Sequence, residues 1–208
     1  MSKRILDYLK ANKWQTFELN LVFVECADAD MKPVPLVIDE WQDRVLLIKA
    51  DGTVLANVVG TTKSGAYYTY NPMSMPGAAR LALGQHLDCW APGQHFSQHV
   101  FTQAEEIVIS RDVNQNGRRD GSEPVQRGWW GTNFHTTGNN ADTPGPARIG
   151  KWSAGCLVVR EPADMYNIIK PTIMSYIGRA GGVSRQAGRL TGTIIDAAAY
   201  QGWRQKWG

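Results

Sequence analysis

The stretch DRVLLIKADGTVLANVVG, residues 43–60, decides the fold class of this chain. Its apolar residues belong to two runs, residues 44–49 and 53–61, and Ala50, Asp51 and Gly52 separate them. An Asp-Gly pair between two such runs is a strong signal for a β-hairpin, because both residue types tolerate the backbone angles of a tight turn. The sequence therefore predicts two neighbouring antiparallel strands here.

Similar strand signals lie on both sides of this hairpin. Residues 17–26 combine Phe17, Leu19 and Phe23 with β-branched valines, a pattern typical of a half-buried strand. Turn-forming residues are frequent, with 21 glycines and 10 prolines. We therefore expect a mainly β fold of sandwich or barrel type, with further strands at residues 67–70, 79–83, 106–110 and 191–200.

Two helices are expected beside the strands. Residues 4–14 have apolar side chains at helical spacing, and residues 162–177 form a longer helix that Pro171 is expected to kink and Gly178 to end. A chain of 208 residues with 43% apolar content is sufficient for one domain. Within it we expect an N-terminal extension of helix and strand (1–42), a core (43–178), and a C-terminal strand and tail (179–208).

Charge and hydropathy exclude several classes of protein. The formal net charge of +3 is too small and too evenly spread to indicate a nucleic-acid groove. No segment reaches the roughly 18 consecutive apolar residues of a membrane helix, and the first residues lack the apolar region of a signal peptide. The three cysteines are an odd and sparse set, which favours free thiols made in a reducing compartment.

One cysteine and one histidine stand out as candidate catalytic residues. Cys156 follows small residues and directly precedes the apolar run 157–159, so its thiol would lie at the mouth of a buried strand. A thiol with a pKa of about 8.5 is mostly protonated at neutral pH and needs a base nearby. His135 also lies where a strand gives way to a loop, and two adjacent strand ends would bring the pair together. The N–H groups of Gly155 and Cys156 could then stabilise an oxyanion.

This arrangement resembles the signature of the L,D-transpeptidase catalytic domain (YkuD-like). Members of that family carry a His, a variable loop, and then Ser or Thr, His, Gly and Cys. In this chain His135 is followed by Ser153-Ala-Gly-Cys156, with Gly150 between them. The hairpin at residues 43–60 resembles the opening hairpin of that domain, so the resemblance covers about residues 43–178.

The resemblance implies a β-rich fold and a cysteine peptidase or transpeptidase that acts on the stem peptides of peptidoglycan through an acyl-enzyme. Cys156 corresponds to the nucleophile and His135 to the base. Thr136 corresponds to the residue that helps orient the imidazole, an arrangement of the triad kind. Ser153 and Gly155 correspond to the loop that shapes the oxyanion site.

Two positions depart from the family pattern. The second His of the family is Ala154 here, and the polar or Arg position soon after the cysteine is Val158, with Arg160 displaced by two. Either hydrolysis of stem peptides or transfer to an amine is compatible with this pattern, because both reactions share the first acylation step. A protein that keeps the fold as a structural or cell-wall-binding module without chemistry is the alternative.

Peptidoglycan lies outside the cytoplasm, and the sequence shows no export signal. Such an enzyme would be made in the cytoplasm and reach the wall after lysis or by delivery. We therefore expect an endolysin-like enzyme, or one carried by a phage tail or a contractile injection particle, with the proteins of that particle as partners.

The segment DVNQNGRRDGSE, residues 112–123, matches the twelve-residue calcium loop. Short side-chain oxygens would converge on a hard cation, Gly117 would permit the sharp turn, and Arg118 would supply its carbonyl. No helices are expected beside it, so the loop would be a structural clip and not a sensor. The predicted ligands are Asp112, Asn114, Asn116, Arg118, Asp120 and Glu123.

A second metal hypothesis competes with the cysteine mechanism. His86, Cys89, His95 and His99 lie within fourteen residues and carry the nitrogen and sulfur atoms that zinc prefers. A zinc hydrolase would use Asp88 or Glu105 as its base. In the cysteine mechanism, by contrast, His95 or His99 would line the cleft.

Overall fold

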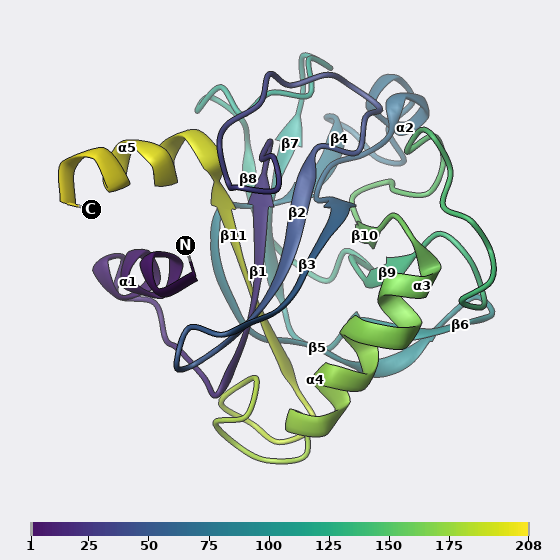
Figure 1. Ribbon diagram of the computed structural model, residues 1–208. Helices are drawn as coiled ribbons and strands as arrows, with labels where there is room; N and C mark the ends of the chain where they lie inside the picture. The colour runs from purple at the N-terminus through teal and green to yellow at the C-terminus, as the bar shows by residue number, and fades with distance from the viewer. Residues whose placement is uncertain (1, 208) are drawn as a thin grey trace.

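The computed structural model describes residues 2–207 and is mainly β, with 33% strand and 19% helix. Eight strands form a closed barrel in the order β1-β11-β5-β6-β9-β10-β3-β2, and β4, β7 and β8 form a second, smaller sheet (Figure 1). The barrel strands are β1 Leu19–Glu25, β2 Asp43–Lys49, β3 Val54–Thr61, β5 Gly84–His95, β6 Gln98–Gln103, β9 Phe134–Thr136, β10 Leu157–Val159 and β11 Leu190–Asp196. The small sheet comprises β4 Ala78–Leu81, β7 Ile107–Asp112 and β8 Val125–Gly128.

Helices cover the barrel from two sides. They are α1 Ser2–Ala11, α2 Ala66–Tyr70, α3 Pro162–Asp164, the π-helical turn η1 Met165–Ile169, α4 Lys170–Tyr176 and α5 Ala197–Trp207. The helix predicted at residues 162–177 is thus present, with the π-helical turn directly before α4, whose second residue is Pro171. None of these helices, within residues 2–207, has the length and apolar character that crossing a membrane requires.

The predicted hairpin is confirmed as β2 and β3. The two strands pair antiparallel, from Asp43 opposite Gly60 to Ile48 opposite Val54. Both faces of β2 are buried. Val45 and Leu47 lie in the barrel core, whereas Leu46 and Ile48 belong to a second apolar cluster outside the barrel. A strand buried on both faces reads as a continuous apolar run, which is the pattern of residues 45–48.

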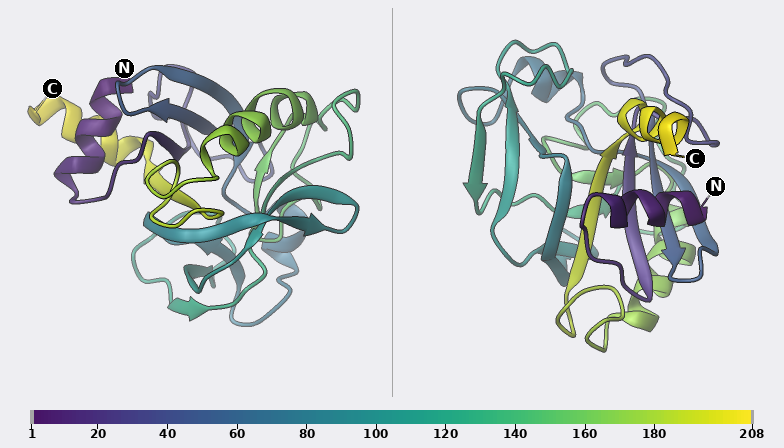
Figure 2. Two further views of the ribbon diagram at one scale, coloured as in Figure 1. Left: turned by 90° about the horizontal axis from the view of Figure 1, so that it is seen from below. Right: turned by 90° about the vertical axis from the view of Figure 1, so that its left-hand side faces the viewer.

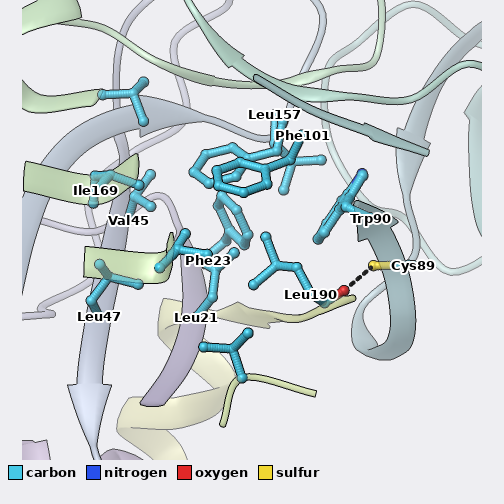
Figure 3. Packing of buried hydrophobic residues seen from close by; sticks show 14 of the residues in the cluster. Leu21, Phe23, Val45, Leu47, Cys89, Trp90, Phe101, Leu157, Ile169 and Leu190 are labelled. Atoms are coloured by element: carbon cyan, nitrogen blue, oxygen red, sulfur yellow. Dashed lines mark hydrogen bonds between the residues drawn. The ribbon is translucent and has the colours of Figure 1, made fainter. Parts of the chain in front are cut away.

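Aromatic side chains fill the centre of the barrel (Figure 3). The ring centroids of Phe23 and Phe134 are 5.1 Å apart and the rings meet edge to face, while Phe101 stacks on Phe134 at 5.9 Å. Leu157 and Ile169 complete this cluster from β10 and the helical segment. Phe134 and Leu157 are the chain neighbours of His135 and Cys156, so the core fixes the backbone on which these two residues sit.

The helices α1 and α5 lie side by side and cover the outer face of β1, β2 and β11 (Figure 2). Because β1 pairs with β2 on one side and with β11 on the other, the expected extension (1–42) and C-terminal strand belong to the barrel itself.

Two local expectations were wrong, and one hairpin was not predicted. Residues 67–70 lie in α2 rather than in a strand, since Ala66 and Thr69 donate backbone hydrogen bonds to Asp39 and Gly65. The predicted strand 191–200 ends at Asp196, whose carboxylate accepts the Ala199 N–H at 2.7 Å and caps α5. The long hairpin of β5 and β6 was not predicted, because Pro92 and Gly93 interrupt its strand pattern.

Candidate active site

The parallel pairing of β9 and β10 places His135 beside Val158, two residues after Cys156. Phe134 pairs with Leu157 and His135 with Val158. The predicted adjacency of the two strand ends is therefore present. Directly before the strands, the Asn133 N–H donates to Cys156 Sγ at 3.4 Å, and the Asn133 carbonyl accepts the Leu157 N–H at 2.9 Å. Asn133 thus connects the two strand ends at the thiol.

His135 and Cys156 line one cavity of about 480 Å³. Gly155 also lines it, whereas Ser153 is buried below the loop and Thr136 below β9. Aromatic and aliphatic side chains form much of the wall. The other lining residues are Tyr68, Met73, Ala79, His95, Phe96, Ser97, Gln98, Trp130, Gly131, Thr132, Asn139, Lys151, Trp152 and Ala154.

The His135 ring is oriented by a main-chain atom. Its Nδ1 lies 2.8 Å from the carbonyl oxygen of Thr136, an atom that can only accept a hydrogen bond. The Nδ1 atom therefore carries the ring proton, and Nε2 keeps its lone pair. Thr136 orients the imidazole as the family resemblance implies, but through its backbone, since its side-chain hydroxyl donates to the Val159 carbonyl.

Burial keeps both reacting groups uncharged at neutral pH. It lowers the pKa of His135 to about 4, with the neighbouring His95 adding to the decrease. Burial also raises the pKa of the Cys156 thiol, and the Asn133 N–H opposes this only in part. The S–H group points to the Gly131 carbonyl at 3.8 Å. The resting pair is thus a thiol and a neutral imidazole.

Ser153 organises the loop before Cys156. Its hydroxyl donates to the Cys156 carbonyl at 2.8 Å and accepts the Gly155 N–H at 3.2 Å. Gly155 has a φ of +130°, and a Cβ there would lie 2.7 Å from the Ala79 carbonyl oxygen. The residue must therefore be glycine. Because the Gly155 N–H already has a partner, the expected pair of free N–H donors at Gly155 and Cys156 is not present.

The sequence did not reveal Asp39, which anchors the loop that leads to Ser153. Its carboxylate accepts the N–H groups of Gly150 at 2.7 Å and of Ala66 at 2.9 Å. A Cβ on Gly65 would lie 2.1 Å from the Gly150 carbonyl oxygen, so the two backbones approach closely. Asp39 itself adopts a φ of +74°. An Asp followed by no recognisable motif carries no sequence signal for such a role.

Two further side chains line the cavity, and His95 is one of the two histidines predicted to do so. His95, at the end of β5, lies beside His135 with ring centroids 5.3 Å apart. Lys151 is the one Lys or Arg among the described residues that line the cavity, and its ammonium group lies 4.1 Å from the Tyr67 ring centroid. Arg160, by contrast, is bound to the Pro146 carbonyl and paired with Glu161.

The residues of the zinc hypothesis are not brought together. The His86 Nε2 atom lies 2.9 Å from the Ala82 carbonyl in another cavity, and the Cys89 thiol donates to Leu190 in the core (Figure 3). His95 lines the candidate active site, and the side chain of His99 lies outside the described part of the chain. Within the described residues, no group of three or more His, Cys, Asp or Glu side chains is placed to hold a metal ion.

Of the two bases considered for zinc, Asp88 is already engaged. Its carboxylate accepts hydrogen bonds from Ser184 and Arg185.

The predicted calcium loop contains an internal cation, the guanidinium group of Arg80 from β4. It donates to the Gly117 carbonyl at 2.7 Å, to the Arg118 carbonyl and to the Glu123 carboxylate. The Arg118 carbonyl and the Glu123 carboxylate are two of the oxygen ligands that the sequence predicts for calcium. Arg80 and Glu123 are both almost completely buried. A calcium ion would have to displace this guanidinium or share its oxygens against charge repulsion.

The remaining predicted ligands bind one another. The Asp112 carboxylate accepts the N–H groups of Asn116 and Gly117, and Asn114 donates to Asp120 at 2.7 Å. The residues therefore fit calcium only in part while Arg80 is in place. The calcium clip stays a prediction. Whether calcium can bind depends on whether Arg80 keeps its hydrogen bonds to the loop oxygens.

The chain matches no protein-family model, no curated protein and no solved structure. The resemblance to the L,D-transpeptidase signature therefore rests on the residues of this chain alone. What supports it is the geometry at His135 and Cys156 described above.

We expect the melting temperature of the wild-type protein to be the same within about 1 °C in calcium and in EGTA, because Arg80 neutralises the buried Glu123. Arg80→Met leaves that carboxylate unpaired and frees its oxygens. We expect this variant to melt lower in EGTA and to regain about 5 °C or more in millimolar calcium. Differential scanning calorimetry measures both effects, and Arg80→Lys is the control that keeps the charge. A wild-type protein that loses stability in EGTA would instead establish the calcium clip.

Proposed function

We propose that this chain is a cysteine enzyme of the L,D-transpeptidase type, with that family's variety of β fold, which processes the stem peptides of peptidoglycan. The observation that carries the proposal is that Cys156 lines the same cavity as a buried imidazole, His135, whose Nδ1 proton is held by a backbone carbonyl. This leaves the Nε2 lone pair of His135 as the base in the cavity that holds the thiol. A buried cysteine that serves only packing needs no such partner.

The reaction begins from the neutral pair. His135 Nε2 takes the proton of the Cys156 thiol as Sγ adds to the carbonyl carbon of the scissile amide. The tetrahedral intermediate collapses as the C–N bond breaks, and the same proton passes from His135 to the leaving amine. A thioester on Cys156 remains. His135 then removes a proton from water or from an acceptor amine, which attacks the thioester and restores the thiol.

Two features of the cavity suit a peptide with a free carboxylate. Lys151 brings a positive charge to the wall of the cavity, whereas Arg160 is hydrogen-bonded to the Pro146 carbonyl. Exposed apolar side chains, among them Phe96 and Met73, form the rim around it. A stem peptide combines carboxylates with aliphatic groups, and such a wall would hold both. Delivery by a phage or by a contractile injection particle stays a prediction.

The alternative is the structural or cell-wall-binding module without chemistry. Ala154 and the engaged Gly155 N–H favour it, because each removes a donor from the site. A variant without the Cys156 sulfur distinguishes the two functions, because only an enzyme would lose its products.

Cys156→Ala should abolish product formation from purified peptidoglycan, with a residual rate below about one thousandth of wild type, because no thioester can form. Mass spectrometry of the soluble fragments detects the products and names the bond that is processed. Cys26→Ala is the matched control, since Cys26 lies outside the cavity. Equal products from wild type and Cys156→Ala would exclude the cysteine mechanism, and no products from either would favour the module.

Thr136→Val should lower the rate far less than His135→Gln, because the acceptor of the His135 Nδ1 proton is a main-chain oxygen. The valine loses only the hydrogen bond to Val159, worth about 1 kcal/mol of stability. His135→Gln removes the base and should cost about 100-fold or more. Initial rates on soluble muropeptides compare the variants, with thermal melting as the control for folding. A large loss in Thr136→Val without a change in stability would assign the role to its hydroxyl.

The pH profile should show an acid limb near pH 4. Only neutral His135 accepts the thiol proton, and its pKa is lowered to about 4 by burial. Activity is therefore present above this pH and is lost as pH falls through it, whereas an unperturbed imidazole would give a limb near pH ~6.5. The measurement is kcat/KM on soluble muropeptides between pH 3.5 and 8, with circular dichroism to show that the fold persists. A midpoint above pH 6 would contradict a buried neutral base.

A further inference from the structure

We propose that His95 is a second catalytic residue of this site, and that its Nε2–H donates a hydrogen bond to the carbonyl oxygen of the scissile bond as Cys156 adds to it. The inference rests on the proposed function and deepens it. The sequence pattern between His135 and Cys156 does not contain this residue, which comes from the far end of the β5–β6 hairpin.

The orientation of one amide fixes the proton on His95. The Gln103 backbone N–H, which can only donate, lies 3.0 Å from Asn133 Oδ1. The other end of the Asn133 amide, Nδ2, is therefore its NH₂ group, and it lies 3.1 Å from His95 Nδ1. Nδ1 must accept this hydrogen bond. The neutral imidazole of His95 then carries its proton on Nε2.

The two imidazoles of the cavity thus have opposite tautomers. His135 is protonated on Nδ1 and offers a lone pair at Nε2, whereas His95 is protonated on Nε2 and offers a donor. Burial lowers the pKa of His95, which favours its neutral form. The ring centroids of His95 and His135 are 5.3 Å apart, so a charged His95 would oppose protonation of His135 during the proposed reaction. One ring is suited to take a proton and the other to stabilise a developing negative charge.

Such a donor would act beside the backbone N–H of Cys156. The Gly155 N–H is held by Ser153, and Ala154 has no polar side chain. The Nε2 atom of His95 has no hydrogen-bond partner in the part of the chain that the structure describes, and His95 lines the same cavity as Cys156. A preorganised donor of this kind strengthens its bond as the oxyanion forms, which is how it accelerates the reaction.

Nitrogen NMR of the imidazole rings tests the tautomers without any substrate. The chain has 4 histidines, so the signals can be assigned with single substitutions. At pH 7 we expect His95 to be protonated on Nε2 alone and His135 on Nδ1 alone. In Asn133→Ala, which removes the amide, the His95 signal should become a mixture of tautomers. A His95 ring protonated on Nδ1 in the wild-type protein would overturn the inference.

Kinetics on soluble muropeptides test the catalytic role. His95→Phe keeps a ring and removes the donor, and we expect kcat to fall about 100-fold with little change in KM. His95→Gln places an amide N–H near the position of Nε2 and should recover at least about tenfold of this loss. Gln94→Ala is the matched control, because Gln94 is an exposed neighbour on β5 that does not line the cavity.

The outcomes separate the inference from the function on which it rests. An inactive Cys156→Ala together with a fully active His95→Phe would leave the cysteine enzyme in place and overturn the role of His95. A loss in His95→Phe that appears only in KM, or that His95→Gln does not relieve, would also overturn it. If Cys156→Ala retains full activity, the proposed function itself fails, and the NMR experiment still decides the tautomer of His95.

Discussion

The parallel pairing of β9 with β10 is the constraint on which the candidate site depends. These strands contain three residues each, and their register sets His135 between the buried residues Phe134 and Thr136 of β9. Phe134 and Leu157 point into the aromatic core, while His135 faces the cavity. Parallel neighbours require a long crossover connection, which explains why residues 137–156 leave the barrel before returning to it. Asp39 and the close approach of Gly65 to Gly150 hold that connection in place.

Asn133 connects Cys156, β10 and His95. Its N–H reaches the Cys156 sulfur, its carbonyl accepts the N–H of Leu157, and its side chain joins the Gln103 backbone to His95. Cys156, the strand pairing and the His95 ring therefore share one residue. Because these groups are buried and neutral, the site avoids the cost of an unpaired buried charge in the resting state. In the proposed reaction, charge develops only when the thiol proton moves to His135.

Local signals account for what the sequence predicted. The hairpin of β2 and β3 follows from an Asp-Gly turn between apolar runs, and the Cys156 and His135 pair follows from a compact motif. The missed features depend on contacts between distant segments. His95 was one of two histidines predicted to line the cleft, but its contact with His135 was not predicted. That contact depends on the long hairpin of β5 and β6, whose strand pattern is interrupted by Pro92 and Gly93. No local pattern encodes a contact of that kind.

The loop at residues 112–123 is stabilised by a cation that the chain itself supplies. Its spacing is that of a calcium loop, yet the Arg80 guanidinium, 32 positions before Asp112 in the chain, binds the Arg118 carbonyl and the Glu123 carboxylate. Arg119 reaches in the opposite direction and pairs with Glu25 on β1 at 2.7 Å, which holds the pKa of that carboxyl at about 2. Two guanidinium groups therefore tie the small sheet and the loop to the barrel. A tethered cation needs no supply of free ions, since folding itself delivers the charge to the loop.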